Sequence, residues 1–377
     1  MLRKLFLEKI CESFEVNPVC ALLGPRQCGK TTISQQYAET LKEKVHVFDL
    51  EDPLDLAKLE NARLAFEALD GLIIIDEIQR IPDLFPIIRV MVDRYKKKFL
   101  ILGSASRDLI NQSSESLAGR ISYIEVTPFS LTEVSDLNRL WLCGGFPKSF
   151  LANSLKQSQD WRKAYIKTFL EQDLRSLGFN VTSDMMRRFW MMIAHYHGQI
   201  FNASEIARSL QITSKTADRY LDILTGTFMV RKLTPWYENL KKRQIKSAKL
   251  YLRDTGIFHS LLGIENNLHS HPKLGASWEG FAIEEIIRFL RMDNESCYFW
   301  GSQSGAELDL LILDGDKRIG FEFKYTNSPK ITKSMHIAME DLKLDQLNII
   351  IPLKTQFALA SNINVFGLEN FILRNKD

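Results

Sequence analysis

One stretch near the start of the chain limits its fold more than any other. An apolar run at residues 19–23 leads directly into Gly24, Pro25, Arg26, Gln27, Cys28, Gly29, Lys30 and Thr31, with Thr32 next. These residues fill every position of a G-x-x-x-x-G-K-T loop between a predicted strand and a predicted helix. Glycines let successive backbone N–H groups face an anion, and the helix N-terminus adds positive potential. The stretch therefore predicts an α/β fold with a phosphate-binding loop.

The residues of this loop have distinct predicted roles. Lys30 would reach the β- and γ-phosphates of a nucleoside triphosphate, and Thr31 would be a ligand of Mg²⁺. We therefore expect residues 24–32 to bind ATP together with Mg²⁺. A glycine-rich turn that binds nothing is the alternative, but every fixed position and both flanks agree with phosphate binding.

A second apolar segment ends in two acids. Residues 72–75 predict a buried central strand, and Asp76 and Glu77 follow it directly. Ligands bind at the carboxyl edge of a parallel sheet, so both acids are expected beside the phosphate loop. Asp76 can hold Mg²⁺ through water, and Glu77 can orient and polarise an attacking water. The pair predicts hydrolysis of the nucleotide as well as its binding.

Two further positions complete the predicted nucleotide site. The apolar residues 99–102 lead to Ser104 and Ser106, and Ser104 is our first choice for a contact with the γ-phosphate or the attacking water. An ordinary turn at the strand end is an equal alternative. Arg120 can stabilise the charge of the transition state across the subunit interface of a homo-oligomer. A solvent-exposed arginine without a catalytic part is the alternative there.

Composition excludes several classes of protein. No apolar stretch approaches the roughly 20 residues that span a bilayer, and the N-terminus lacks the apolar core of a signal peptide, so we expect a cytoplasmic protein with no membrane partner. The 5 cysteines form no C-x-x-C pair, and neither a zinc site nor a disulfide framework is predicted. The 49 basic and 46 acidic residues nearly balance, so a nucleic-acid site must depend on local patches.

The pattern of strands and helices divides the chain into predicted domains. In residues 1–135, apolar strands near 19–23, 45–50, 71–75, 99–102 and 121–126 alternate with helices, which is typical of a parallel sheet. Residues 136–200 are predicted to be a helical connector, 201–258 a helical module ending in a hairpin, and 275–377 a helix followed by strands. The Gly, Pro, Asn and Ser of residues 259–276 indicate a linker.

Taken together, the motifs resemble a known family. Residues 24–31, 72–79, 103–106, 117–120 and 128–131 are similar to the bacterial and archaeal AAA-type P-loop ATPases that carry a C-terminal domain of unknown function. The similarity continues at residues 165–173, 250–257 and 278–285, so it covers nearly the whole chain. The resemblance implies ATP binding with Mg²⁺ and hydrolysis, and it implies no known substrate.

Residues 201–258 predict a winged helix-turn-helix. Residues 203–210 and 214–224 are expected helices on either side of a short turn, and strands near 229–234 and 245–252 follow. An exposed second helix suits the major groove of DNA, and basic side chains on it suit phosphate contacts. A structural lid with solvated charges is the alternative. The residues predicted to contact nucleic acid are Lys215, Arg219, Lys241, Lys242 and Arg243.

Four charged residues near the C-terminus form a second candidate site. Glu284 lies in a predicted helix, Asp309 in a predicted strand, and Glu322 and Lys324 in the next strand. This order of an acid, an Asp and a Glu-x-Lys resembles the restriction-endonuclease-like nucleases. Asp309 and Glu322 can share a divalent cation, and Lys324 can orient the attacking water from the same face. A nuclease-like fold that does not cut is the alternative.

The sequence therefore predicts a Mg²⁺-dependent ATPase that acts on or near DNA. Its predicted architecture is a P-loop sheet followed by a winged module and a small restriction-endonuclease-like α/β domain. Two other functions stay open: an ATP-gated, metal-dependent nuclease, and an interaction protein that nucleotide hydrolysis switches between partners.

Overall fold

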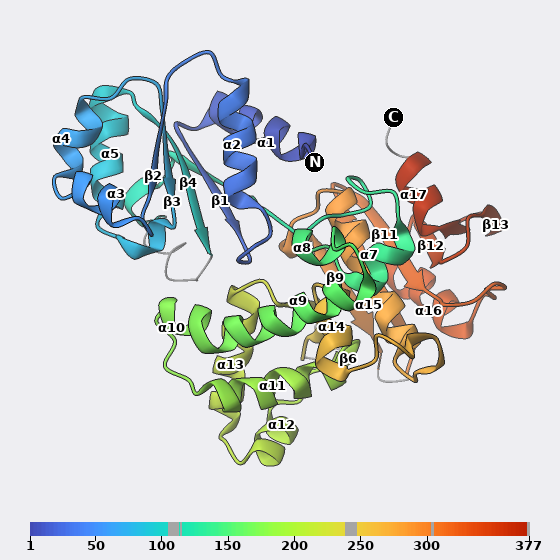
Figure 1. The fold of residues 1–377 in the computed structure, drawn as a ribbon. Coiled ribbons are helices and arrows are strands. Elements are labelled where there is room, and N and C mark those ends of the chain that lie inside the picture. The colour runs from blue at the N-terminus through green and yellow to red at the C-terminus, as the bar shows by residue number, and fades with distance from the viewer. Residues whose placement is uncertain (105–112, 114, 238–246, 303–304, 375–377) are drawn as a thin grey trace. The chain divides into compact units, whose positions relative to one another are not determined.

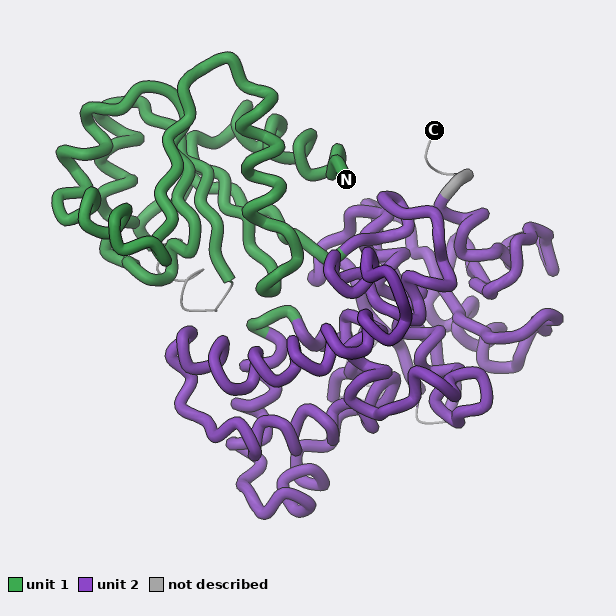
Figure 2. Tube along the Cα trace, in the orientation of Figure 1, with its two compact units in different colours: residues 1–128, 226–228 green, residues 129–225, 229–377 purple. Residues whose placement is uncertain are grey.

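The computed structural model describes residues 1–104, 113, 115–237, 247–302 and 305–374. The chain forms two compact units (Figure 2): unit 1 contains residues 1–128 and 226–228, and unit 2 contains residues 129–225 and 229–377. Ser106, Lys241, Lys242 and Arg243 lie outside the described residues.

Unit 1 contains a five-stranded parallel sheet in the order β2-β3-β4-β1-β5 (Figure 1). Residues of β1 and β3 are buried along their whole length, as expected for strands covered on both faces. All five predicted strands form, which confirms the α/β fold class. Their bounds are β1 (Val19–Gly24), β2 (Val45–Asp49), β3 (Leu72–Asp76), β4 (Lys98–Ser104) and β5 (Ile121–Glu125).

Helices of unit 1 close the core over the sheet. Phe66 packs edge-on against Phe48 and Phe99, with ring centroids 5.7 and 5.4 Å apart, and so joins a helix to two strands. Register places Gly24 beside Ser104 and Asp49 beside Asp76, which brings the ends of neighbouring strands to one edge. The helices are α1 (Lys4–Val16), α2 (Lys30–Thr40), α3 (Pro53–Lys58), α4 (Ala62–Glu67) and α5 (Leu84–Tyr95), with a 3-10 helix at Ile78–Arg80.

Unit 2 begins with helices and continues into a large sheet. The helices predicted at residues 203–210 and 214–224 form, and the predicted helical connector contains a π-helical turn (Phe169–Asp173). Bounds of the helices are α7 (Leu137–Cys143), α8 (Pro147–Phe150), α9 (Leu155–Thr168), α10 (Leu174–Ser176), α11 (Ser183–His195), α12 (Ala203–Leu210), α13 (Ser214–Gly226), α14 (Thr255–Leu262), α15 (Leu274–Phe289), α16 (Lys333–Leu342) and α17 (Leu368–Arg374).

The sheet of unit 2 has the order β13-β14-β12-β11-β10-β9-β7-β8-β6. Strand β7 pairs with β8 on one side and with β9, through Thr234 and Tyr298, on the other. The hairpin after α13 is therefore continuous with the C-terminal strands. The strands are β6 (Gln199–Ile200), β7 (Val230–Pro235), β8 (Lys249–Leu252), β9 (Cys297–Gly301), β10 (Glu307–Asp314), β11 (Lys317–Phe323), β12 (Gln346–Ile351), β13 (Gln356–Ala360) and β14 (Ile363–Gly367).

The stretch predicted as a linker, residues 259–276, contains the end of α14 and the start of α15. His259 is fully buried in α14, where its ring nitrogens lie 3.1 Å from the Leu142 carbonyl oxygen and 2.7 Å from Ser277 Oγ. The segments predicted as three separate domains (136–200, 201–258 and 275–377) all fall within unit 2. Within the described ranges, no helix combines the length and the apolar character that crossing a membrane requires.

Candidate functional site

The phosphate loop joins β1 to α2, as its sequence predicts. Gly29 has φ of 102°, in the left-handed region that glycine adopts without strain, and Lys30 is the first residue of α2. A Cβ atom on Gly24 would lie 2.2 Å from the carbonyl oxygen of Val126, so only glycine fits there. The loop is thus folded tightly against the segment that leaves β5.

Hydrogen bonds hold the loop together and connect it to the acidic pair. The Nζ of Lys30 donates to the carbonyl oxygens of Gly24 and Pro25, each at 3.0 Å, and so curls over the loop. Thr31 Oγ1 donates to Asp76 Oδ2 at 2.7 Å. Because this bond joins two motifs from the ends of separate strands, the loop and the acidic pair form one site.

Glu77 has an unusual backbone conformation beside this contact. Its φ of 54° and ψ of 44° lie in the left-handed region, which costs a non-glycine residue on the order of 1 kcal/mol. Its backbone N–H donates to Asp76 Oδ1 at 2.9 Å, and its carboxylate accepts from Gln79 and lies 4.0 Å from Arg26. Burial raises the pKa of Glu77, while the charges of Lys30 and Arg26 oppose the rise. A carboxylate of raised pKa can accept a proton from water.

Ser104 and Arg120 differ in their burial and in their hydrogen-bond partners. Ser104 is 4% exposed, and its Oγ lacks a hydrogen-bond partner among the residues that the structure describes. Since buried hydroxyls are normally bonded, this atom is a candidate to contact a ligand. Arg120 is partly exposed and binds Asp93 of α5 through two contacts, 2.6 and 3.0 Å long.

The second candidate site gathers at the start of β10 and the end of β11. Lys324 Nζ lies 2.7 Å from Glu322 Oε2 and 3.8 Å from Asp309 Oδ2. Asp309 Oδ2 also accepts from the backbone N–H of Phe323 at 3.1 Å. The structure therefore brings Asp309, Glu322 and Lys324 together.

Sequence analysis missed three residues of this site: Lys249, Glu279 and Glu307. We call its four acids, Glu279, Glu307, Asp309 and Glu322, the carboxylate cluster. Lys249 of β8 is 4% exposed, pairs with Glu307, and lies 3.7 Å from both Glu279 and Asp309. Glu279 of α15 accepts from Tyr251 Oη at 2.5 Å. Burial raises the pKa of Glu279 and of Glu322, and the charge of Asp309 adds to both rises.

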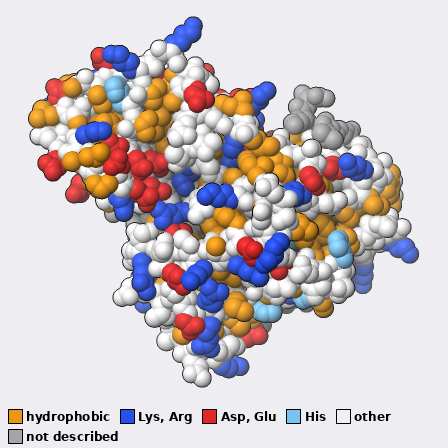
Figure 3. All heavy atoms as spheres, viewed as in Figure 1, with side chains coloured by type: hydrophobic (Ala, Val, Ile, Leu, Met, Phe, Trp, Pro, Cys, Tyr) orange, Lys and Arg blue, Asp and Glu red, His pale blue; other side chains and the backbone are white. Residues whose placement is uncertain are grey.

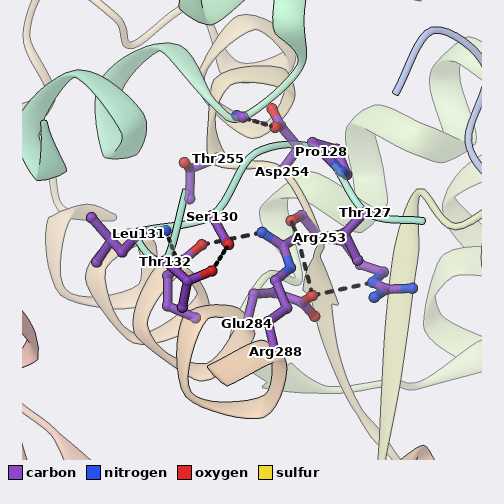
Figure 4. A network of polar contacts seen from close by, with 12 residues as sticks. Thr127, Pro128, Ser130, Leu131, Thr132, Arg253, Asp254, Thr255, Glu284 and Arg288 are labelled. Carbon is purple, nitrogen blue, oxygen red and sulfur yellow. Dashed lines mark hydrogen bonds and ion pairs between the residues drawn. The ribbon is translucent and has the colours of Figure 1, made fainter. Parts of the chain in front are cut away.

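Glu284, the helix acid that we predicted for this cluster, lies in a different network. Arg253 and Arg288 contact its carboxylate at 3.2 and 3.4 Å (Figure 4), and Arg231 binds it as well. The three arginines hold the pKa of Glu284 well below its usual range despite burial. Glu279 and Glu284 are five positions apart, which places them about 140° apart around a helix. Nothing in the sequence indicates which of the two faces β10.

The two sites differ in how well they fit a metal ion. Thr31 and Asp76 offer neighbouring oxygen atoms, which suit Mg²⁺ because this ion takes few protein ligands and completes its shell with phosphates and water. Across the described ranges, no group of three or more His, Cys, Asp or Glu residues is arranged to hold a metal ion. The carboxylate cluster therefore does not fit a metal as it stands, since Lys249 and Lys324 contact its oxygens.

The predicted nucleic-acid residues that the structure describes lie on one helix. Lys215 and Arg219 are exposed and are four residues apart on α13, so they share a face. Strands β7 and β8 pair antiparallel after this helix, and β6 pairs with β8.

Models of three known domains match successive parts of the chain. An AAA domain matches residues 16–135, a domain of unknown function (DUF8612) matches residues 134–268, and another domain of unknown function (DUF4143) matches residues 274–371. The first match covers the phosphate loop and the acidic pair.

Relatives that are similar over most of this chain occur in bacteria and archaea. The uncharacterized protein Rv2008c of Mycobacterium tuberculosis is 49% identical over 352 residues, which cover 92% of this chain and 79% of that protein. The uncharacterized protein MJ1544 of Methanocaldococcus jannaschii is 23% identical over 374 residues, covering 89% of this chain and 82% of the relative.

A solved structure supports the fold of the chain. The Walker-type ATPase PABY2304 of Pyrococcus abyssi is similar with a TM-score of 0.50 and 18% identity, over 69% of this chain and 95% of that one. With the domain matches, the 49% identical relative and the geometry of the phosphate loop, the chain belongs to the AAA-type P-loop ATPases that carry a C-terminal DUF4143 domain.

Proposed function

We propose that unit 1 hydrolyses ATP with Mg²⁺ and that unit 2 uses this hydrolysis on or near DNA. The observation that carries the first part is the hydrogen bond from Thr31 to Asp76, because it unites the phosphate loop with the acidic pair. When bound, Mg²⁺ would be held by Thr31 and Asp76 and would neutralise part of the phosphate charge.

The residues of the chain have separate parts in this reaction. Lys30 exchanges its two backbone carbonyl partners for phosphate oxygens, which a cation binds more strongly. Glu77 orients the attacking water and accepts its proton. The hydroxyl of Ser104, which lacks a partner among the described residues, donates to the γ-phosphate or to that water.

Two variants separate binding from hydrolysis. Lys30→Ala is expected to lose both nucleotide binding and turnover. Glu77→Gln keeps the size of the side chain and is expected to bind ATP as the wild type does, while turnover falls by about 100-fold or more because the proton acceptor is gone. Calorimetric binding and phosphate release measure the two effects. Turnover that is unchanged in both variants would refute the proposal.

We also propose that Arg120 acts across the subunit interface of a homo-oligomer. An arginine that acts on a neighbouring subunit's nucleotide would have to leave Asp93, its partner here. We expect Arg120→Ala to reduce turnover and to leave the ATP dissociation constant unchanged, with Arg89→Ala of the same unit as the control. Equal loss of turnover in both variants would remove Arg120 from the mechanism.

The proposed contact with DNA uses the exposed face of α13. Lys215 and Arg219 support it, and their charge would bind phosphates rather than bases. On the face drawn in Figure 3, however, Lys and Arg side chains of unit 2 are interspersed with acidic ones. The proposal is therefore for weak, salt-sensitive binding and not for a large electrostatic surface.

A pair of double variants tests this contact. Lys215→Ala with Arg219→Ala is expected to weaken DNA binding and to lower its salt dependence by about two phosphate contacts. Arg187→Ala with Arg188→Ala removes the same charge from an exposed part of α11 and serves as the control. Turnover that DNA does not change, together with equal binding by both variants, would favour the nucleotide-switched interaction protein instead.

The nuclease alternative is not part of the proposal. Asp309, Glu322 and Lys324 do lie together, but the cluster does not fit a metal ion as the described residues stand. We therefore derive no cutting step.

A further inference from the structure

A buried arginine lies behind the phosphate loop. Arg3, which precedes α1, is 2% exposed. Its Nη1 donates to the carbonyl oxygen of Cys28 at 2.9 Å, in the middle of the loop. Neither the sequence motifs nor the roles assigned above involve this residue.

The other side of the same guanidinium is also fixed. Arg3 Nη2 donates to the carbonyl oxygens of Thr127 at 3.0 Å and Pro128 at 3.4 Å, and the guanidinium carbon lies 4.5 Å from the centre of the Phe6 ring. The planar, five-donor group therefore bridges the phosphate loop and the segment that follows β5. Because the guanidinium is fixed by these contacts, it can hold the Cys28 carbonyl of the loop in one position.

The contact with the Cys28 carbonyl fixes the orientation of the Cys28–Gly29 peptide group in the loop. In a trans peptide the C=O of Cys28 and the N–H of Gly29 point in opposite directions. With the carbonyl turned toward Arg3, the N–H of Gly29 faces away from the guanidinium. A Cβ on Gly29 would lie 3.7 Å from Arg3 Nη1, so the guanidinium backs this part of the loop closely. A charged donor also polarises the peptide and strengthens its N–H as a donor.

We propose that Arg3 is a positioning residue for nucleotide binding: it holds the Cys28–Gly29 peptide so that the Gly29 N–H faces the phosphates. This inference rests on the proposed binding of ATP by the loop. Arg3 acts through the loop backbone and does not touch the nucleotide.

Two substitutions of Arg3 and one control test the proposal. Arg3→Met removes the donors and keeps an apolar stem, whereas Arg3→Lys keeps the charge but cannot bridge both sides. Gln36→Ala is the matched control, because Gln36 accepts from the backbone N–H of Arg3 at 3.2 Å and donates to the Met1 carbonyl at 2.8 Å without a hydrogen bond to the loop. The control therefore loosens the N-terminal segment alone.

Calorimetry with a non-hydrolysable ATP analogue and Mg²⁺ gives the dissociation constant of each full-length variant. We expect Arg3→Met to bind about tenfold or more weakly, since a hydrogen bond to a charged group is lost. Arg3→Lys should recover part of the affinity, and Gln36→Ala should bind as the wild type does. Scanning calorimetry without nucleotide measures the stability of each variant separately.

The outcomes are distinct. A wild type that does not bind the analogue overturns the proposed function. If the wild type binds and Arg3→Met binds equally well, the positioning role is wrong. Equal weakening in Gln36→Ala and Arg3→Met would also overturn it, because docking of the N-terminal segment would then explain both. Should Arg3→Met fail to fold, Arg3→Lys with wild-type affinity overturns the inference and reduced affinity supports it.

Discussion

Replacing Glu285 by glutamine is expected to make the free energy of unfolding of unit 2 fall less as the pH rises. Glu285 of α15 is 1% exposed, and its carboxylate accepts from the Leu131 backbone N–H at 2.7 Å and from Arg288 Nη1 at 3.1 Å. Burial raises the pKa of Glu285 to about 7, from an ordinary value of 4.5, although Arg288 opposes the rise. The folded chain therefore holds a proton that the unfolded chain has already released.

The sign and size of the effect follow from this difference. Between pH 4.5 and pH 7 the folded state binds more protons than the unfolded state, so the free energy of unfolding falls as the pH rises. One pH unit of difference corresponds to about 1.4 kcal/mol, which gives about 3 kcal/mol for Glu285. Most of this loss falls between roughly pH 5 and pH 8. A glutamine side chain at this position would keep an acceptor for Leu131 and would not titrate.

The assay is urea unfolding at pH 5 and pH 8, followed by tryptophan fluorescence. All 6 tryptophans lie in unit 2, so the signal reports on this unit alone. The wild type should lose about 2.5 kcal/mol more than Glu285→Gln between the two pH values. Glu340→Gln, at an exposed position of α16, controls for net charge. A Glu285→Gln variant whose stability keeps the wild-type pH dependence would refute the reasoning.

Two other substitutions test the two sites. Gly24→Ala should abolish nucleotide binding, because its Cβ would lie 2.2 Å from a backbone oxygen. Gly275→Ala, whose Cβ would have nothing within 4 Å, should bind nucleotide as the wild type does. Calorimetry measures both, and normal binding by Gly24→Ala would contradict the packing argument. Lys249→Met should destabilise unit 2 by about 3–5 kcal/mol near neutral pH by leaving buried carboxylates uncompensated. Without nucleotide, Lys249→Met should also gain Mn²⁺ binding, measured by electron paramagnetic resonance, and adding Asp309→Asn should remove it. If the wild type already binds Mn²⁺ and Asp309→Asn removes that binding, the conclusion that the carboxylate cluster does not fit a metal ion is contradicted.

The geometry of the phosphate loop and the acidic pair could be predicted because these residues are local in sequence and their fold is stereotyped. Gly24, Gly29 and Lys30 belong to one loop, and Asp76 and Glu77 end one apolar strand. Parallel strands meet at a common edge, so the contact between Thr31 and Asp76 follows from the order of the elements. What the pattern did not indicate is the left-handed backbone of Glu77, since no sequence signal marks a strained non-glycine residue.

The carboxylate cluster could be predicted only in part, because its members come from distant segments. Asp309 and Glu322 are on neighbouring antiparallel strands, and the spacing indicates this. The choice between Glu279 and Glu284 depends on how α15 is rotated against the sheet. Lys249 lies at this cluster because β8 belongs to the same sheet: β8 pairs with β7, and β7 pairs with β9 across the predicted domain boundary.

A comparison of the charges in the two sites explains why ATP hydrolysis is the function that the structure supports best. In the carboxylate cluster, Lys249 and Lys324 already contact Asp309, so cations of the chain itself occupy the place that a metal ion would take. In the phosphate loop, by contrast, the ammonium of Lys30 donates to backbone carbonyls, and the Ser104 hydroxyl lacks a partner among the described residues. Buried polar groups held this weakly gain most when an anion arrives, and a polyphosphate supplies both the charge and the acceptors that they need.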